Sequence, residues 1–94
     1  MDQAEYHRAT QLLVERGVSL QSHEYNERSF GSWCLVASTQ PPRRIVWDGK
    51  EQWLVVEEET AEQFNGLPVW RELWLKRNAN PKNIEQALSV LCSK

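Results

Sequence analysis

The densest group of side chains that could do chemistry in this chain is acidic. Four carboxylates fall within six residues, at Glu57, Glu58, Glu59 and Glu62. Paired carboxylates can hold a cation or act as general acid and base, but a metal loop would need further oxygen ligands at defined spacing. We therefore expect no metal site here. The acids form either a solvated strand edge or a patch that contacts a basic partner, which would relieve their mutual repulsion.

Tryptophan is the unusual residue type, with five in 94 residues against two Phe and two Tyr. Trp70 and Trp74 are spaced one helical turn apart with Arg71 between them, so they either cover the sheet or offer an aromatic, basic surface to a partner. We place Trp33 and Trp53 in the sheet core. The candidate partner-binding residues are then Glu57, Glu58, Glu59, Glu62, Trp70, Arg71 and Trp74.

Other catalytic arrangements are not indicated by the sequence. His7 and His23 have no cysteine and orienting group near them in the chain, as a Cys–His nucleophile would require. The four glycines are scattered and form no phosphate loop. Cys34 and Cys92 are too few for a disulfide scaffold, so we expect two reduced, buried thiols. We expect no catalytic residue, no cofactor and no metal, and therefore not an enzyme.

Length and composition are those of one globular domain, which we place over residues 1–94. Hydrophobic residues make up 40% and charged residues 26% of the chain. The net charge of −2 argues against a general nucleic-acid binder. The first residues do not have the pattern of a secretory signal, and the apolar runs are far shorter than the ~20 residues of a membrane helix. We expect a cytoplasmic protein with no membrane anchor, and its oligomeric state is left open.

Two helices are predicted at the ends of the chain. Asp2 and Glu5 have capping-box spacing at the start of a helix over 3–16, and Gly17 is suited to end it. Asn80 is expected to cap a C-terminal helix in which Pro81 takes the first position, and the apolar residues of this helix recur at helical spacing, namely Ile84, Ala87, Leu88 and Leu91. Each helix has one apolar stripe, so both should pack on one sheet face.

Strands are predicted in the middle of the chain, over residues 22–28, 32–39, 43–47 and 52–58. Asp48-Gly49 lies between two of them and predicts a tight hairpin turn with Gly49 at positive φ. A two-residue loop would pair Trp47 with Lys50, and a four-residue loop would pair it with Gln52; the sequence leaves both registers open. Trp47 is harder to bury than the other strand tryptophans because it lies at this hairpin end.

The segment after this hairpin is ambiguous. We interpret 60–64 as one helical turn closed by Asn65-Gly66, and 68–76 as a short helix, although the alternation of 68–76 also fits a strand. The fold class is α+β: an N-terminal helix, a three- to four-stranded, mostly antiparallel meander, a short Trp-bearing segment and a C-terminal helix packed on one sheet face.

Four stretches of the chain resemble small uncharacterised bacterial proteins rich in tryptophan, some of which are presumed immunity proteins of polymorphic toxin systems. These stretches are 30–36, 44–50, 53–55 and 70–74. The resemblance rests on Trp-rich strands and an Asp-Gly turn, and it carries over no functional residue. It implies a non-enzymatic cytosolic protein that binds another protein.

Residues and resemblance together predict a small protein-binding domain, either an immunity-type inhibitor or an acidic chaperone. Two alternatives stay open. One is a small-molecule-binding domain with a Trp-lined pocket. The other is a nucleic-acid accessory protein that would use the basic segment Trp70–Lys82, because cations beside aromatic rings can hold a backbone and stack bases.

Overall fold

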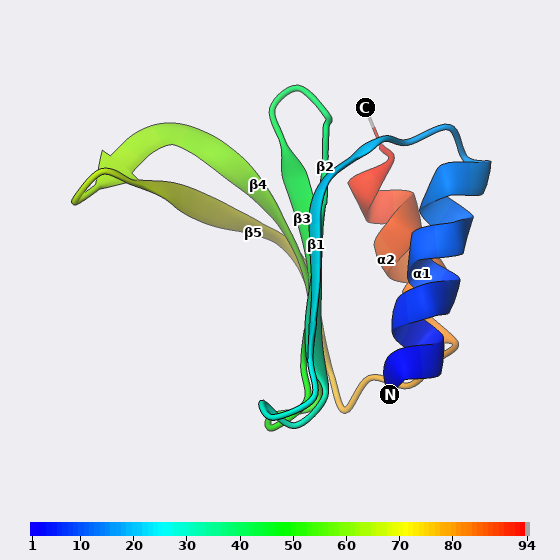
Figure 1. Ribbon diagram of the computed structural model, residues 1–94. Helices are drawn as coiled ribbons and strands as arrows, with labels where there is room; N and C mark the ends of the chain where they lie inside the picture. The colour runs from blue at the N-terminus through cyan, green and yellow to red at the C-terminus, as the bar shows by residue number, and fades with distance from the viewer. Residues whose placement is uncertain (94) are drawn as a thin grey trace.

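The computed structural model describes residues 1–93 as two helices packed on one antiparallel sheet (Figure 1). The elements are α1 (Gln3–Glu15), β1 (Leu20–Asn26), β2 (Ser32–Ala37), β3 (Arg43–Asp48), β4 (Trp53–Phe64), β5 (Leu67–Arg77) and α2 (Asn83–Leu91). The strands follow one another in the sheet in their sequence order. The α+β class is confirmed, and the meander has five strands where three or four were expected. Neither of these helices has the length and apolar character needed to cross a membrane.

Helix α1 is set by the local signals that the sequence carries. The Asp2 carboxylate accepts a hydrogen bond from the Ala4 amide at 2.9 Å, as an N-cap does. At the other end Gly17 takes a φ of 74°, and the Val18 amide donates to the Leu13 carbonyl. The left-handed glycine and this backward hydrogen bond end the helix as predicted.

Helix α2 begins slightly later than the sequence indicates. The Asn80 side chain accepts a hydrogen bond from the Lys82 amide at 2.9 Å, so it caps the turn that leads into the helix. The helix itself starts at Asn83. Its apolar stripe is fully buried, as predicted, and comprises Ile84, Ala87, Leu88 and Leu91.

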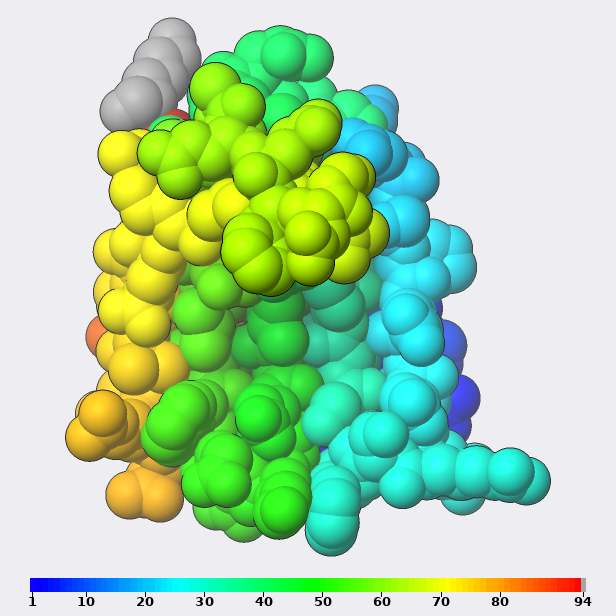
Figure 2. Space-filling view, turned by 90° about the vertical axis from the view of Figure 1, so that its left-hand side faces the viewer, coloured from blue at the N-terminus to red at the C-terminus, as the bar shows by residue number. Residues whose placement is uncertain are grey.

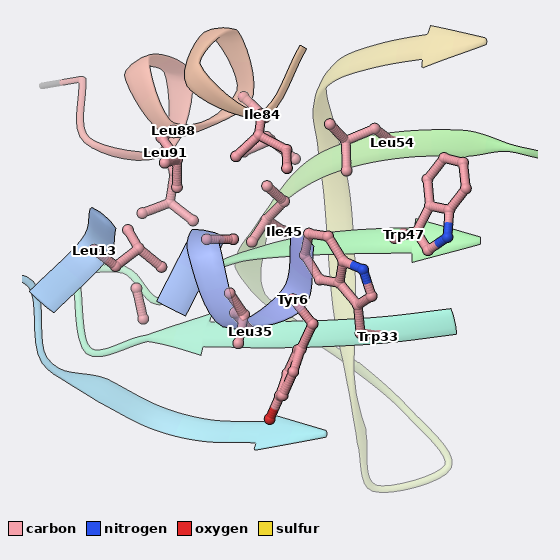
Figure 3. Close-up of a cluster of buried hydrophobic side chains, with 14 of the residues drawn as sticks. Tyr6, Leu13, Trp33, Leu35, Ile45, Trp47, Leu54, Ile84, Leu88 and Leu91 are labelled. Atoms are coloured by element: carbon pink, nitrogen blue, oxygen red, sulfur yellow. The ribbon is translucent and has the colours of Figure 1, made fainter. Parts of the chain in front are cut away.

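The core lies between the helices and one face of the sheet (Figure 3). Trp33 and Trp47 are directly paired across β2 and β3, and each is only 2% exposed. The expectation that Trp47 is hard to bury was therefore wrong. The chain turns only beyond Asp48, so Trp47 pairs with Leu54 and both side chains are buried on the helix side.

Residues 60–64 and 68–76 form strands, not the helical turn and short helix that we expected. They belong to β4 and β5, which run beyond the other strands as a projecting hairpin (Figure 1). We call residues 59–70 the arm. Asn65 and Gly66 have φ values of 53° and 79°, and Phe64 pairs with Leu67. This is the two-residue turn that Asn-Gly favours, and cross-strand pairing outweighs the local helical spacing.

Two irregularities curve the arm away from the helices. One is an extra residue in β5, Leu73, where the pairing shifts between Val56 and Glu57. The other lies on β4, where three residues stand opposite Val69 and the Thr60 hydroxyl donates to the Val69 carbonyl at 2.9 Å. Such bulges bend and twist a strand. The arm therefore arches over the sheet face that the helices leave uncovered (Figure 1).

The loop between β3 and β4 differs from both predicted registers. Asp48 pairs with Trp53 and Trp47 with Leu54, so the loop has four residues, as in one of the two alternatives, but the partner of Trp47 lies two residues later than Gln52. Gly49 is not at positive φ; Gln52 takes the left-handed position instead, with φ of 60°. Gly49 is needed for a steric reason, because a Cβ there would lie 1.9 Å from the Phe30 carbonyl oxygen.

We predict that Gly49→Ala lowers the free energy of unfolding by about 2 kcal/mol, because the new methyl group would force two loop backbones apart. Gly49→Asn should lower the free energy of unfolding by at least as much, because asparagine also has a Cβ. If Gly49 were required only for a left-handed φ, asparagine would be tolerated there. Urea denaturation would measure both. A Gly49→Asn midpoint equal to that of the wild type would contradict the steric account.

Candidate functional site

The sheet face opposite the helices, which we call the open face, is apolar at its centre. Cys34, Val46, Val55 and Leu75 pair in one row across β2 to β5, and all four are half-buried. An antiparallel sheet normally carries polar residues on its solvated face. Figure 2 shows this face, with the arm standing out over its upper part. The molecule thus presents a partly apolar surface overhung by a projecting hairpin.

Trp53 lies on the open face and not in the core, which corrects its predicted position. It pairs with Asp48 in β3 and with Arg77 in β5. The Arg77 guanidinium lies 5.5 Å from the centroid of the Trp53 ring, within cation–π distance. The ring is therefore partly covered by a cation at one end of the open face.

At the other end of the open face, Arg44 organises the root of the arm. Its Nε donates to the Glu57 carboxylate at 2.7 Å, and its guanidinium carbon lies 4.2 Å from the centroid of the Trp70 ring. One cation thereby joins an acid of β4 to an aromatic residue of β5. Trp70 is held in one place at the root of the arm without entering the core.

A second charged group lies on the helix side of the sheet. The Glu58 carboxylate accepts hydrogen bonds from Arg43 Nε at 2.9 Å and from Arg71 at 2.6 Å. Arg43 also donates to the carbonyls of Val90 and Leu91 at the end of α2. The hydrogen bond from Arg43, with the charges of both arginines, holds the pKa of Glu58 below its ordinary value despite its burial.

The structure divides the seven candidate residues between the two faces of the sheet. Glu57, Glu59 and Trp70 lie on the open side. Glu58, Arg71 and Trp74 lie on the helix side, where Trp74 packs against the core. The extra residue in β5 separates the two tryptophans, which would otherwise share a face. Glu62 lies in the outer part of the arm.

Two of the acids have cationic partners, because strand register brings three arginines beside them. Arg43 and Arg71 pair with Glu58, and Arg44 pairs with Glu57. None of these partners is close in sequence, so a strand register was needed to find them. Within residues 1–93, Glu59, Glu62 and Glu72 have no ion pair.

The tip of the arm was missed from the sequence. Phe64 and Leu67 are directly paired there and are 71% and 67% exposed. The Asn65-Gly66 pair between them was the available signal, because Asn-Gly between two apolar residues favours a two-residue hairpin. Two large apolar side chains therefore stand together at the end of a projecting hairpin.

The open face also has a small hollow of about 260 Å³, lined by Glu24, Ser32 and Cys34 among others. This is slightly below the ~300 Å³ at which ligand pockets usually begin. Burial raises the pKa of the Cys34 thiol, so the thiolate is disfavoured. Cys92, expected to be buried, is exposed because α2 ends at Leu91. Both cysteines are free thiols.

The lowered pKa of Glu58 predicts a pH-dependent contribution to stability. Its stabilising effect should be complete above the unfolded-state pKa of about 4.3 and should disappear as the pH falls through the lower folded-state pKa. We expect Glu58→Gln to be less stable than the wild type at pH 7, with the difference shrinking below about pH 4. Glu62→Gln is the control, and a difference that is constant with pH would refute the assignment.

The two thiols should react at different rates. We expect a thiol reagent to modify Cys92 quickly in the native protein and Cys34 slowly, because Cys92 is exposed, whereas Cys34 is half-buried and its raised pKa disfavours the reactive thiolate. The Cys92→Ser variant should lose the fast phase in a stopped-flow labelling experiment. Fast labelling that persists in this variant would show that Cys34 is accessible.

The site combines an apolar sheet face, a curved arm and cations stacked on aromatic rings. Among residues 1–93, no three side chains of His, Cys, Asp or Glu are grouped so that they could hold a metal ion. The arrangement is suited to contact with another molecule over a broad surface. Comparisons with protein-family models, with curated proteins and with solved structures found no match to this chain.

Proposed function

We propose that this chain is a non-enzymatic protein-binding domain, and that its partner contacts the open face and the arm. The observation that carries the proposal is the position of the arm. The core is filled by the helices and the inner sheet face, so the fold does not need a curved hairpin that reaches over the opposite face. A projecting element that leaves apolar side chains exposed is typical of an interaction surface.

The open face has the composition of a protein contact. Its centre is apolar, with Val46, Val55 and Leu75 in one row, and Trp70 is fixed at its margin by Arg44. Tryptophan and arginine are enriched among the residues that contribute most to binding affinity. A partner seated under the arm would contact both the apolar row and Trp70. An immunity-type inhibitor or an acidic chaperone would use such a surface.

The two alternatives draw less support from the same residues. The basic segment that a nucleic acid would need has Arg71 paired with Glu58 and Arg77 placed over Trp53, and the arm is acidic. For a small molecule, the hollow on the open face has only about 260 Å³. A larger hollow of about 660 Å³ at the root of the arm is open and is lined by Pro42, Glu59 and Thr60 among others, not by tryptophan. Extended contact with a protein fits the surface better than either.

The test begins with the tagged full chain as bait in an extract of its source cell after nuclease treatment. We expect one protein to remain bound in stoichiometric amount through gel filtration. Trp70→Ala should weaken that complex at least about tenfold while lowering the free energy of unfolding by only about 1–2 kcal/mol. Trp70→Phe, which keeps an aromatic ring for Arg44, should restore most of the affinity.

Three results would overturn the proposal. A metabolite retained in native mass spectrometry, with no protein bound, would indicate the small-molecule alternative. A steeply salt-dependent affinity for RNA or DNA would indicate the nucleic-acid alternative. A partner bound equally well by wild type and Trp70→Ala would place its contact elsewhere on the chain.

A further inference from the structure

We infer that the tip of the arm is the anchor of the interaction, and that it fits an apolar pocket rimmed by lysine or arginine on a partner protein. This inference rests on the proposed function and names the chemistry of the partner. It uses Phe64 and Leu67 as the inserted pair, with Glu59 and Glu62 as the charges that meet the basic rim.

The apolar part of the argument comes from the turn geometry. Phe64 and Leu67 are paired across a two-residue turn, so their side chains stand on the same side of the hairpin. Isolated surface hydrophobics are common and need no explanation. Here two such side chains stand together at the end of an arm, outside the buried cluster. In this exposed position they contribute less stabilisation than they would if they were buried in a partner. Burying both in a pocket would remove this apolar surface from water.

The charge of the arm selects the kind of pocket. Residues 59–70 include Glu59 and Glu62 and no Lys, Arg or His. Neither carboxylate has an ion pair within residues 1–93, whereas Glu57 and Glu58 are already neutralised by arginines. The charge that the arm offers to a partner is therefore negative, and a basic rim is complementary to it.

The same charges disfavour other occupants. A membrane surface is usually anionic and would repel an acidic arm, and a nucleic acid would be repelled in the same way. A second copy of this chain would place its own acidic arm or the acids of its open side, such as Glu24 and Glu72, near the tip. A basic protein is the occupant that satisfies both the apolar tip and the acidic flanks.

The experiment locates the contact before measuring it. The full chain carries a photoreactive phenylalanine analogue at position 64 and is irradiated in extract of the source cell, and the cross-linked peptide is sequenced. We expect one protein, joined at an apolar pocket bordered by Lys or Arg. That protein is then purified and its binding kinetics are measured by surface plasmon resonance at low and high salt.

Two pairs of variants separate the tip from its flanks. Phe64→Thr with Leu67→Thr should raise the dissociation constant at least about thirtyfold, because it removes the anchor while keeping strand propensity. Val14→Thr, which changes a 62% exposed residue of α1, is the matched control. Glu59→Gln with Glu62→Gln should slow association severalfold and flatten its salt dependence. Glu27→Gln with Glu51→Gln makes the same change in net charge far from the arm and should have little effect.

The outcomes distinguish this inference from the proposed function. If wild type binds a protein but no cross-link forms through position 64, or the tip variants bind as wild type does, the anchor is wrong and the proposed function stands. A cross-link to a second copy of the chain, or association that is insensitive to Glu59 and Glu62, also overturns the inference. If wild type binds no protein at all, both fail.

Discussion

Arg43 joins parts of the molecule that are distant in sequence. From β3 it bonds Glu58 in β4 and the carbonyls of Val90 and Leu91 at the end of α2. A helix C-terminus carries partial negative charge, so a cation there is favourable. Through Glu58 the same group reaches Arg71 in β5. The arm root and the last helix are thus fixed to one another by a chain of charge-assisted hydrogen bonds.

The uneven coverage of the sheet follows from the size of the chain. Two helices with one apolar stripe each can cover only one face. On the other face, arginine side chains cover part of the aromatic surface: Arg44 lies over Trp70 and Arg77 lies over Trp53. Each guanidinium lies within cation–π distance of its ring. This lets a small domain keep tryptophan at its surface in a defined orientation.

Both helices could be predicted because their signals are local. Asp2, Gly17 and the C-terminal stripe act within a few residues of where they stand in the chain. The strands β1 to β3 were also predicted from the sequence. The Asp48-Gly49 turn was located correctly, but its geometry was not, because the decisive contact is with Phe30 in another loop. A close contact between two loops that are distant in sequence cannot be predicted from the local sequence of either loop.

Residues 68–76 could not be assigned from sequence because two patterns coincide there. Trp70, Leu73 and Trp74 have helical spacing, while the same segment alternates as a strand. Pairing with β4 decides between them, and the extra residue Leu73 then sends the two tryptophans to opposite faces. The acidic candidates all lie in β4. Their arginine partners could not be foreseen, because cross-strand neighbours depend on a register that the sequence leaves open.

The sequential strand order has a consequence for the growing chain during synthesis. Each strand pairs with the one made just before it, so the sheet can assemble progressively from β1 as residues emerge, through contacts of short sequence separation. Helix α2 comes last, yet it supplies Ile84, Leu88 and Leu91 to the core over β3 and β4. Until α2 is made, a nascent sheet exposes apolar surface on its inner face. The growing chain is therefore most vulnerable to aggregation in the interval between the synthesis of β5 and that of α2.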